Sequence, residues 1–315
     1  MKSTFVVIII IFCSFKLFAQ DDSTIVDVNE TGRAQNTEAT KVFYAQRLIN
    51  ANTVEVLRKG ILEFKVIHNF GDIAGAGGGI KNFFGLDNAA DIKIAFQLAL
   101  GNKLNVVAAR AKGASLVQQL WELGLKYQFL QQMEKDSKHP ISLTLYANTV
   151  ISGMKRSAFH NQESSFEDFS DRLSQMIQLM IARKFGGVSL QLSPTYVHTN
   201  FVVPGDDKSI FAIGGAIRLP LTKKFVLIAD YFHPFRSEES RNVLRSEGVH
   251  LYDVFGAGIE IITEGHIFHL NFTNATNIIE NRFLTRTNTS WGEGQYRWGF
   301  SIARRFVMFK DKKKN

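Results

Sequence analysis

The chain is poor in cysteine and in proline. Its 315 residues contain one cysteine, Cys13, and five prolines. Cys13 lies in the N-terminal stretch MKSTFVVIIIIFCSFKLFAQ, in which a basic start at Lys2 precedes an apolar run and the small residue Ala19. This pattern is typical of a secretory signal peptide over residues 1–20, with cleavage after Ala19 or Gln20. The mature chain would then have no disulfide, no cysteine-ligated metal and no cysteine nucleophile.

Long hydrophobic runs are also missing after this segment. No later stretch approaches the roughly eighteen consecutive apolar residues that a membrane-spanning helix needs. The dominant pattern is instead an alternation of period two, which indicates β-strands with one apolar face. In the stretch ADIKIAFQLAL, for example, Ile92, Ile94 and Phe96 share one face, whereas Asp91 and Lys93 share the other.

About twelve segments of this kind follow one another, and most have the length of a tilted strand that crosses a bilayer, roughly 9–13 residues. They lie near 61–70, 91–100, 104–112, 119–131, 141–151, 171–185, 188–199, 209–219, 224–234, 250–262, 266–273 and 295–307.

The connections between these segments alternate in length. Short turns such as GNK at 101–103 and TEG at 263–265 alternate with long loops such as 152–170 and 274–294. The sequence therefore predicts an all-β protein: a closed antiparallel transmembrane β-barrel of about twelve strands in the cell outer membrane, with short periplasmic turns, longer extracellular loops and both termini in the periplasm. A soluble β-sandwich or barrel is the alternative, but about twelve strands enclose more space than apolar side chains readily fill.

Charged side chains recur on the polar face of the predicted strands. Because an unpaired charge away from water is costly, we expect these groups to pair and to fill the lumen. Glu63 and Asp91 lie on this face by strand parity. The other predicted lumen-lining residues are Lys65, Lys93, Glu122, Lys126, Arg172, Arg218, Asp230, Glu260, Arg297 and Arg305.

The stretch GAGGGIKN in the first long loop resembles a phosphate-binding loop only superficially. It lacks the Lys-Ser/Thr pair of such loops and it does not connect a strand to a helix. We interpret it as part of a loop that folds over or into the barrel mouth, although a merely mobile loop is also consistent with the glycines. The predicted plug residues are Gly77, Gly78, Gly79, Phe83, Phe84 and Asp87.

The segments outside the predicted barrel at 60–307 differ in composition. Residues 21–40 are polar, whereas the stretch KVFYAQRLINANTVEVLRKG that follows has apolar content. We expect 21–59 to be an N-terminal periplasmic segment, partly mobile, whose second half could be an extra strand, a short helix or a periplasmic plug. Residues 308–315 form a basic tail that ends in KDKKKN and contributes to the net charge of +8. Since no nucleic-acid reading motif accompanies this tail, we expect a solvated terminus and no nucleic-acid partner.

His68, Phe70 and Gly71 precede the glycine-rich loop, and the stretch FFGLD follows at 83–87. With these residues, part of the sequence resembles an uncharacterised family of outer-membrane β-barrel proteins from Bacteroidota. The stretches GLKYQFL, EGHIFHLNFTN and RWGFSIARRF also look like this family, so that the resemblance covers about 43–307. Asn69 stands where the family has an arginine. The resemblance implies a barrel and its location, but no established activity.

Residues with catalytic or metal-binding chemistry are sparse. The chain is similar in strand count to outer-membrane phospholipases, whose dyad needs a histidine and a serine two positions apart. No His-x-Ser occurs, and the nearest stretch is HTN, which begins at His198. His266 and His269 are three residues apart on a strand, so they face opposite sides and do not suggest a metal site. We therefore expect no enzyme, no cofactor and no metal.

Two function classes follow. The first is a small pore or transport barrel, or a structural barrel, with an occluded lumen. The second is a docking scaffold that binds partners through its loops, and a lipid hydrolase is a distant third. The expected partners are outer-membrane lipid together with small solutes or another envelope protein.

Overall fold

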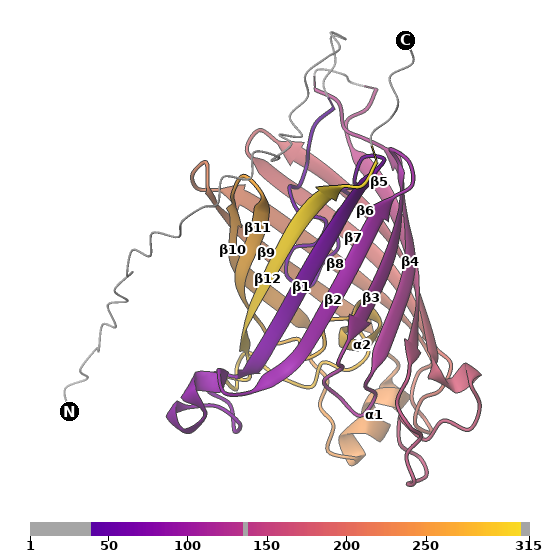
Figure 1. The fold of residues 1–315 in the computed structure, drawn as a ribbon. Coiled ribbons are helices and arrows are strands. Elements are labelled where there is room, and N and C mark those ends of the chain that lie inside the picture. The colour runs from indigo at the N-terminus through magenta and orange to yellow at the C-terminus, as the bar shows by residue number, and fades with distance from the viewer. Residues whose placement is uncertain (1–38, 135–137, 310–315) are drawn as a thin grey trace, which may run out of the picture.

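The structure is a computed structural model that describes residues 39–134 and 138–309. Over this part of the chain, twelve antiparallel strands form one closed barrel (Figure 1). Each strand pairs with its neighbour in sequence, and β1 closes the barrel against β12. The predicted fold class is thereby confirmed.

The strands have nearly the predicted boundaries. The largest difference at a strand start concerns the tenth strand, which was predicted from residue 250 and begins at Val254. The strands are β1 Ile61–Asp72, β2 Ala89–Ala99, β3 Leu104–Ala111, β4 Leu120–Leu130, β5 Ser142–Ser152, β6 Leu173–Phe185, β7 Val188–Thr199, β8 Ser209–Pro220, β9 Phe225–Phe235, β10 Val254–Ile262, β11 His266–Thr273 and β12 Arg297–Val307.

Short helical segments occur in the long loops. The 3₁₀ segments are η1 Ile80–Gly85 and η2 Ser170–Arg172, and the α-helices are α1 Glu238–Ser246 and α2 Glu280–Phe283. The start of α1 is capped by Ser237, whose hydroxyl accepts a hydrogen bond from the Ser240 amide at 3.1 Å.

The apolar face of the strands points outward. In β4, Trp121, Leu123 and Leu125 are 55 %, 59 % and 55 % exposed, whereas Glu122 and Lys126 between them are each 2 % exposed. A soluble barrel would show the opposite arrangement, so this wall is built to face lipid. No helix in the described part of the chain is long and apolar enough to cross a membrane.

The two rims of the barrel differ. The short turns lie at one rim and the long loops, with η1, α1 and α2, at the other (Figure 1). Ala39 forms an isolated bridge with Met133 in the β4–β5 connection, and the Met308 amide donates to the Gly60 carbonyl at 2.8 Å. Both ends of the described chain therefore lie at the short-turn rim, which faces the periplasm in outer-membrane barrels. The predicted signal peptide and the end of the basic tail fall outside the described residues.

Candidate functional site

The lumen contains a segment of the chain that precedes the barrel. Residues 39–59 enter from the short-turn rim, turn inside the barrel and return to β1; we call them the lumen hairpin. The turn is held by hydrogen bonds from the Leu48 amide to the Ala51 carbonyl, 2.9 Å, and from the Thr53 amide to the Gln46 carbonyl, 3.1 Å. The described part of the predicted periplasmic segment is therefore a plug within the lumen.

The tip of the lumen hairpin is fixed by one wall carboxylate. Asp230 Oδ2 accepts hydrogen bonds from the amides of Ile49, Asn50 and Ala51 at 3.2, 2.7 and 2.9 Å. The other oxygen, Oδ1, accepts from Asn50 Nδ2 at 2.8 Å. A carboxylate that accepts several backbone amides forms strong, charge-assisted hydrogen bonds, so Asp230 holds the tip against β9.

The arms of the lumen hairpin bind side chains of the wall in the same way. The Val54 amide donates to Gln191 Oε1 at 2.9 Å, and the Leu57 amide donates to Asn105 Oδ1 at 2.7 Å. The Thr144 hydroxyl donates a hydrogen bond to the Val54 carbonyl at 2.6 Å. The polar residues of the strands thus satisfy backbone groups of a segment that is not itself in the sheet.

Apolar side chains complete this packing. Phe43, Leu48, Ile49 and Val54 of the lumen hairpin are buried in one cluster with residues from the wall. The wall residues of the cluster include Met176, Met180, Val197, Phe232 and Val254. The lumen around these residues is therefore packed as a protein core and does not form a continuous water-filled bore.

A second insert enters from the opposite rim. The connection 274–296, which contains α2 and which we call the α2 loop, has Ile278, Ile279 and Phe283 buried inside the barrel. The Ile278 amide donates to Asp91 Oδ2 at 2.9 Å, and the ring of Phe283 lies 5.3 Å from that of Phe232. Asp91 thus holds a backbone amide of this insert, as Asp230 does for the lumen hairpin.

The two inserts meet inside the barrel. Arg47 of the lumen hairpin donates through Nη2 to the Ile278 carbonyl at 2.7 Å, and its Nη1 lies 3.8 Å from Glu280 Oε2. Asn52 Nδ2 donates to the same Glu280 oxygen. Arg47, Ile278 and Glu280 are buried, and Asn52 is partly buried. The lumen is therefore blocked from both rims by segments that are bonded to each other.

Most of the predicted lumen charges lie inside the barrel and are paired. Arg218 lies 2.7 Å from Glu260, and Lys93 forms an ion pair with Glu122. Glu63 lies 2.9 Å from Arg305 and 3.7 Å from Lys65.

Two predicted lumen residues bind the lumen hairpin instead of a charge on the wall. One is Asp230, described above. The other is Lys126, whose Nζ donates to Gln46 Oε1 at 3.2 Å. These two contacts could not be predicted from strand parity alone, because parity gives the face of a residue and not its partner.

Arg297 and Arg172 lie near the long-loop rim. Arg297 pairs with Asp72 at 2.7 Å, at the ends of β12 and β1. Arg172 belongs to η2 and precedes β6, so the parity that placed it in the lumen does not apply there. It donates to the carbonyls of Ser152 and Met154 and lies over the ring of Phe166, 4.9 Å from its centroid. The expectation that Arg172 pairs with a lumen carboxylate is wrong.

The glycine-rich loop does not enter the lumen. The chain after β1 leaves the wall sideways (Figure 1). Ile80 is exposed on it. Of the six predicted plug residues, Gly77, Phe83, Phe84 and Asp87 are exposed, and Gly78 and Gly79 are partly exposed. The expectation that this loop, with Gly77, Gly78, Gly79, Phe83, Phe84 and Asp87, occludes the lumen is wrong, because the lumen hairpin and the α2 loop already fill that space.

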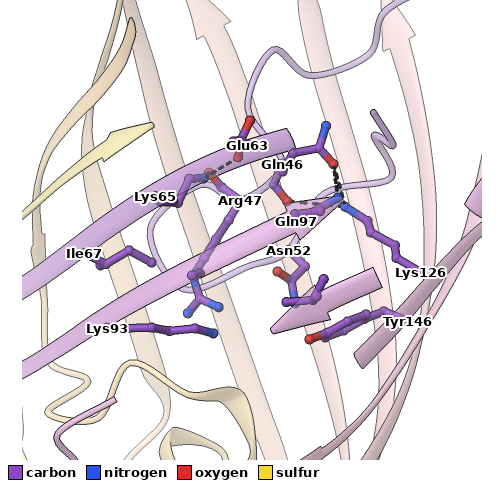
Figure 2. Close-up of a pocket in the computed structure, with 12 residues that line it drawn as sticks. Gln46, Arg47, Asn52, Glu63, Lys65, Ile67, Lys93, Gln97, Lys126 and Tyr146 are labelled. Carbon is purple, nitrogen blue, oxygen red and sulfur yellow. Dashed lines mark hydrogen bonds and ion pairs between the residues drawn. The ribbon is translucent and has the colours of Figure 1, made fainter. Parts of the chain in front are cut away.

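A small cavity remains between the lumen hairpin and the wall of β1–β5. Its volume is about 40 Å³, which is room for a few water molecules, since each needs roughly 10–15 Å³. Figure 2 shows Arg47, Lys65, Lys93 and Lys126 around it, with Tyr146 at one side. The inserts therefore leave a small polar space open next to the wall of β1–β5.

The outer end of the α2 loop is held by a network of charges, which we call the mouth network. Arg282 and Arg286 both pair with Glu163, Arg286 also pairs with Asp206, and Asp206 pairs with Arg236. These residues come from four different long loops of the described chain. Burial alone would raise the pKa of Glu163, but the two arginines beside it lower that pKa from 4.5 to about 2.

Two histidine–serine contacts are present among the described residues, and neither suggests catalysis. Inside the barrel, His269 Nδ1 lies 3.2 Å from Ser301 Oγ and His269 Nε2 lies 3.3 Å from Glu260 Oε2, but all three residues are buried and Glu260 also binds Arg218, so this group is part of the lumen packing.

The second contact lies at the ends of β7 and β8 near the long-loop rim. His198 Nδ1 lies 2.9 Å from Ser209 Oγ across β7 and β8, and the Tyr196 hydroxyl lies 2.9 Å from the same oxygen. A serine nucleophile needs a base that a third group orients. Within the described part of the chain, His198 Nε2 has no hydrogen-bond partner. No cluster of three metal-ligating His, Cys, Asp or Glu residues occurs among the described residues either.

The sequence matches the model of a family of membrane-bound β-barrels. The model of the family described as "Membrane bound beta barrel domain (DUF5777)" matches residues 43–306. The chain belongs to this family. The match begins within the lumen hairpin and ends within β12, so it includes both inserts together with the wall. No curated protein matches the chain.

Solved structures with a similar fold are outer-membrane porins and channels. The NanC porin has a TM-score of 0.46 at 7 % identity, over 79 % of this chain and 100 % of its own. The KdgM porin has a TM-score of 0.46 at 7 % identity, over 78 % and 99 %. An outer-membrane channel from Pseudomonas putida F1 has a TM-score of 0.45 at 10 % identity, over 80 % and 98 %.

The family, the outward apolar wall and the unequal rims together confirm the expected location in the outer membrane. The expected bacterial group stays a prediction.

The lumen hairpin is the main functional element that the sequence did not reveal. Its stretch KVFYAQRLINANTVEVLRKG has no clear period, because its environment is a barrel interior on all sides. One signal was present: Val42, Phe43, Leu48, Ile49 and Val54 are too apolar for a segment that stays in water. Such content in front of a polar-walled barrel favours insertion over a free periplasmic segment.

Proposed function

We propose that this protein is a porin-like outer-membrane barrel that is closed at rest and passes small solutes only when the lumen hairpin is displaced. The observation that carries the proposal is the contact between the two inserts, in which Arg47 binds both the Ile278 carbonyl and Glu280. This contact blocks the lumen at mid-depth. The barrel around it keeps a polar wall that could hold water.

The composition of the wall supports a channel over a purely structural barrel. Twelve strands give a bore between that of filled eight-stranded barrels and that of open porins with about sixteen strands. Beside the apolar wall residues of the cluster described above, polar side chains of the strands bind the lumen hairpin, among them Asn105, Thr144, Gln191 and Asp230. If the lumen hairpin left, these groups would be hydrated at little cost, whereas an apolar wall would collapse or aggregate.

Conductance in planar bilayers tests the proposal. We expect the wild-type barrel to be closed, and a variant that lacks residues 39–58 to conduct steadily. The matched control lacks Ala76–Phe84 of the glycine-rich loop, which removes a loop outside the lumen and should leave the barrel closed. Heat-modifiable migration on gels shows which variants are folded.

Either of two results would overturn the proposal. A folded barrel without residues 39–58 that does not conduct would indicate a structural barrel. A large, steady conductance of the wild type would indicate an open porin in which the inserts do not block passage.

A docking scaffold is the second candidate, and the mouth network favours it. Four long loops are tied together by Glu163, Asp206, Arg236 and the two arginines of the α2 loop. Fixed loops present a preorganised surface, which lowers the entropic cost of binding a partner. Cross-linking on intact cells would show a captured envelope protein with the wild type and less of it with Arg286→Ala. Equal capture by both would count against a role for this surface.

A further inference from the structure

The loop between β1 and β2 has a defined position at the outer rim. We call residues 73–88 the projecting loop. Its base extends the pairing of β1 with β12: the Ile73 amide donates to the Tyr296 carbonyl at 2.8 Å, and the Ala74 amide donates to the Gly294 carbonyl at 3.2 Å. Beyond this base, the loop extends sideways from the wall and away from the barrel mouth (Figure 1).

The tip of the projecting loop is apolar and exposed. Ile80 is 80 % exposed, Phe83 is 60 % exposed and Phe84 is 45 % exposed. Leu86 follows them and is also exposed. In water, such a cluster at the end of a loop would be unfavourable, and its presence on a folded protein marks a surface that something apolar covers.

The loop presents these side chains in a fixed conformation. Phe83 and Phe84 have φ values of 45° and 53°, a left-handed conformation that bulky residues rarely adopt. The Phe84 amide donates to the Gly79 carbonyl at 2.8 Å, which closes the turn. Gly85 then approaches Gly71 so closely that a Cβ would lie 2.3 Å from the Gly71 carbonyl oxygen. Backbone strain that tertiary contacts maintain is a mark of function.

The neighbouring wall supplies the reason to expect lipid. An aromatic belt covers the outer face of β10–β12 at the same rim: Trp291 stacks on Tyr296 at 4.5 Å, and Phe272 lies 4.3 Å from Trp298. Aromatic belts of this kind lie at the membrane–water interface. The projecting loop is bonded directly to Tyr296, so its base starts at the depth of this belt.

We propose that the projecting loop is an interfacial anchor that inserts Ile80, Phe83 and Phe84 into the apolar part of the outer leaflet. Its occupant is the acyl region of the membrane lipid, because the exposed cluster continues the lipid-facing surface of the wall. The anchor fixes the depth of the barrel on the side of β1 and β2. It acts independently of whether the lumen conducts.

Site-directed fluorescence quenching tests this anchor. A bimane label is placed at Ile80→Cys in the full chain that also carries Cys13→Ser, which leaves a single thiol. The protein is folded into phosphatidylcholine vesicles with or without brominated acyl chains. Leu123→Cys, in the middle of the lipid-facing wall, is the positive control, and Glu239→Cys on the exposed face of α1 is the negative control.

We expect brominated lipid to quench the labels at Ile80→Cys and at Leu123→Cys to a similar extent and to leave the label at Glu239→Cys unchanged. Gly85→Ala should reduce the quenching at Ile80→Cys, since the added Cβ collides with Gly71 and displaces the tip. A label at Ile80→Cys that behaves like the one at Glu239→Cys in a folded barrel overturns the proposal, and it would leave a protein partner as the occupant.

Discussion

The lumen hairpin and the α2 loop fill the same barrel but are held by different forces. The lumen hairpin is held deep inside by hydrogen bonds from its backbone amides to neutral and acidic side chains of the wall, of which Asp230 contributes most. The α2 loop is held mainly at its outer end, by arginines that pair with Glu163 and Asp206. The lumen hairpin therefore depends mainly on buried hydrogen bonds and packing, whereas the α2 loop depends also on charged pairs near the rim that pH and salt can reach.

The largest effect should come from removing each insert in turn. Deletion of residues 39–58 also removes the Arg47 and Asn52 contacts that hold Ile278 and Glu280 of the α2 loop, so it should change the barrel from closed to conducting in planar bilayers. Replacement of residues 276–285 of the α2 loop by a short Gly-Ser linker should leave it nearly closed, because the lumen hairpin still spans the inner half of the lumen. If the second variant conducts as well as the first, the α2 loop blocks the lumen as strongly as the lumen hairpin does, and the expected difference between the two inserts is absent.

Asp230→Ala should weaken the lumen hairpin strongly. The substitution leaves the amides of Ile49, Asn50 and Ala51 buried without an acceptor, and each lost bond of this kind costs about 1–3 kcal/mol. We expect a loss of about 3–5 kcal/mol in the free energy of unfolding, measured by urea titration in lipid vesicles. Asp230→Asn is the matched control and should cost less, since one carbonyl oxygen remains. Equal stability of Asp230→Ala and wild type would show that the tip is not anchored there.

The α2 loop should respond to acid, and the lumen hairpin should not share this response. The arginines lower the pKa of Glu163 from 4.5 to about 2, so its ion pairs stabilise the fold fully above pH 4.5 and lose this effect as the pH falls towards 2. The contribution is about 3 kcal/mol. The hydrogen-exchange protection of residues 280–287, taken relative to the intrinsic exchange rate at each pH, should therefore fall between pH 4.5 and 2 in the wild type. Glu163→Gln should show low protection at every pH, and a wild-type profile in that variant would contradict the assignment.

The smallest effects should come from the two arginines at the outer ends of the strands. Arg297→Ala leaves Asp72 without its partner, but Asp72 is partly exposed and can be hydrated. Arg172→Ala removes bonds to two carbonyls and a contact with Phe166, and no carboxylate is left unpaired. We expect losses of about 1 kcal/mol for each in urea unfolding. A loss above that of Asp230→Ala would show that these rim contacts contribute more to the free energy of unfolding than the contact of Asp230 with the lumen hairpin.

Much of the fold could be predicted from the sequence because the strand period carries so much information. In β4, the alternation of Trp121, Leu123 and Leu125 with Glu122 and Lys126 specifies both the strand and its two faces. The site was predictable only in part. Lys93 and Glu122, like Arg218 and Glu260, are buried and form ion pairs, whereas Arg172 lies one residue before β6, where strand parity no longer applies.

The segments that occlude the lumen could not be identified from the local sequence. Glycines at 77–79 and the pair Phe83 and Phe84 suggested a loop that closes the mouth, but the same residues also suit a loop that leaves the wall. Local sequence gives conformational freedom and apolar content; it does not give the direction in which a loop extends. That direction depends on what else occupies the lumen, and here the lumen hairpin and the α2 loop occupy it.

The number of strands, their order, their two faces and the unequal rims follow from local periodicity and from the lengths of the connections, so they could be predicted without the structure. What fills the barrel depends instead on tertiary contacts. Asp230 and Ile49 are 181 residues apart, and Arg47 and Ile278 are 231 apart, yet their contacts close the lumen. Contacts between such distant residues form only after the barrel wall has brought them together, so no local pattern could encode them.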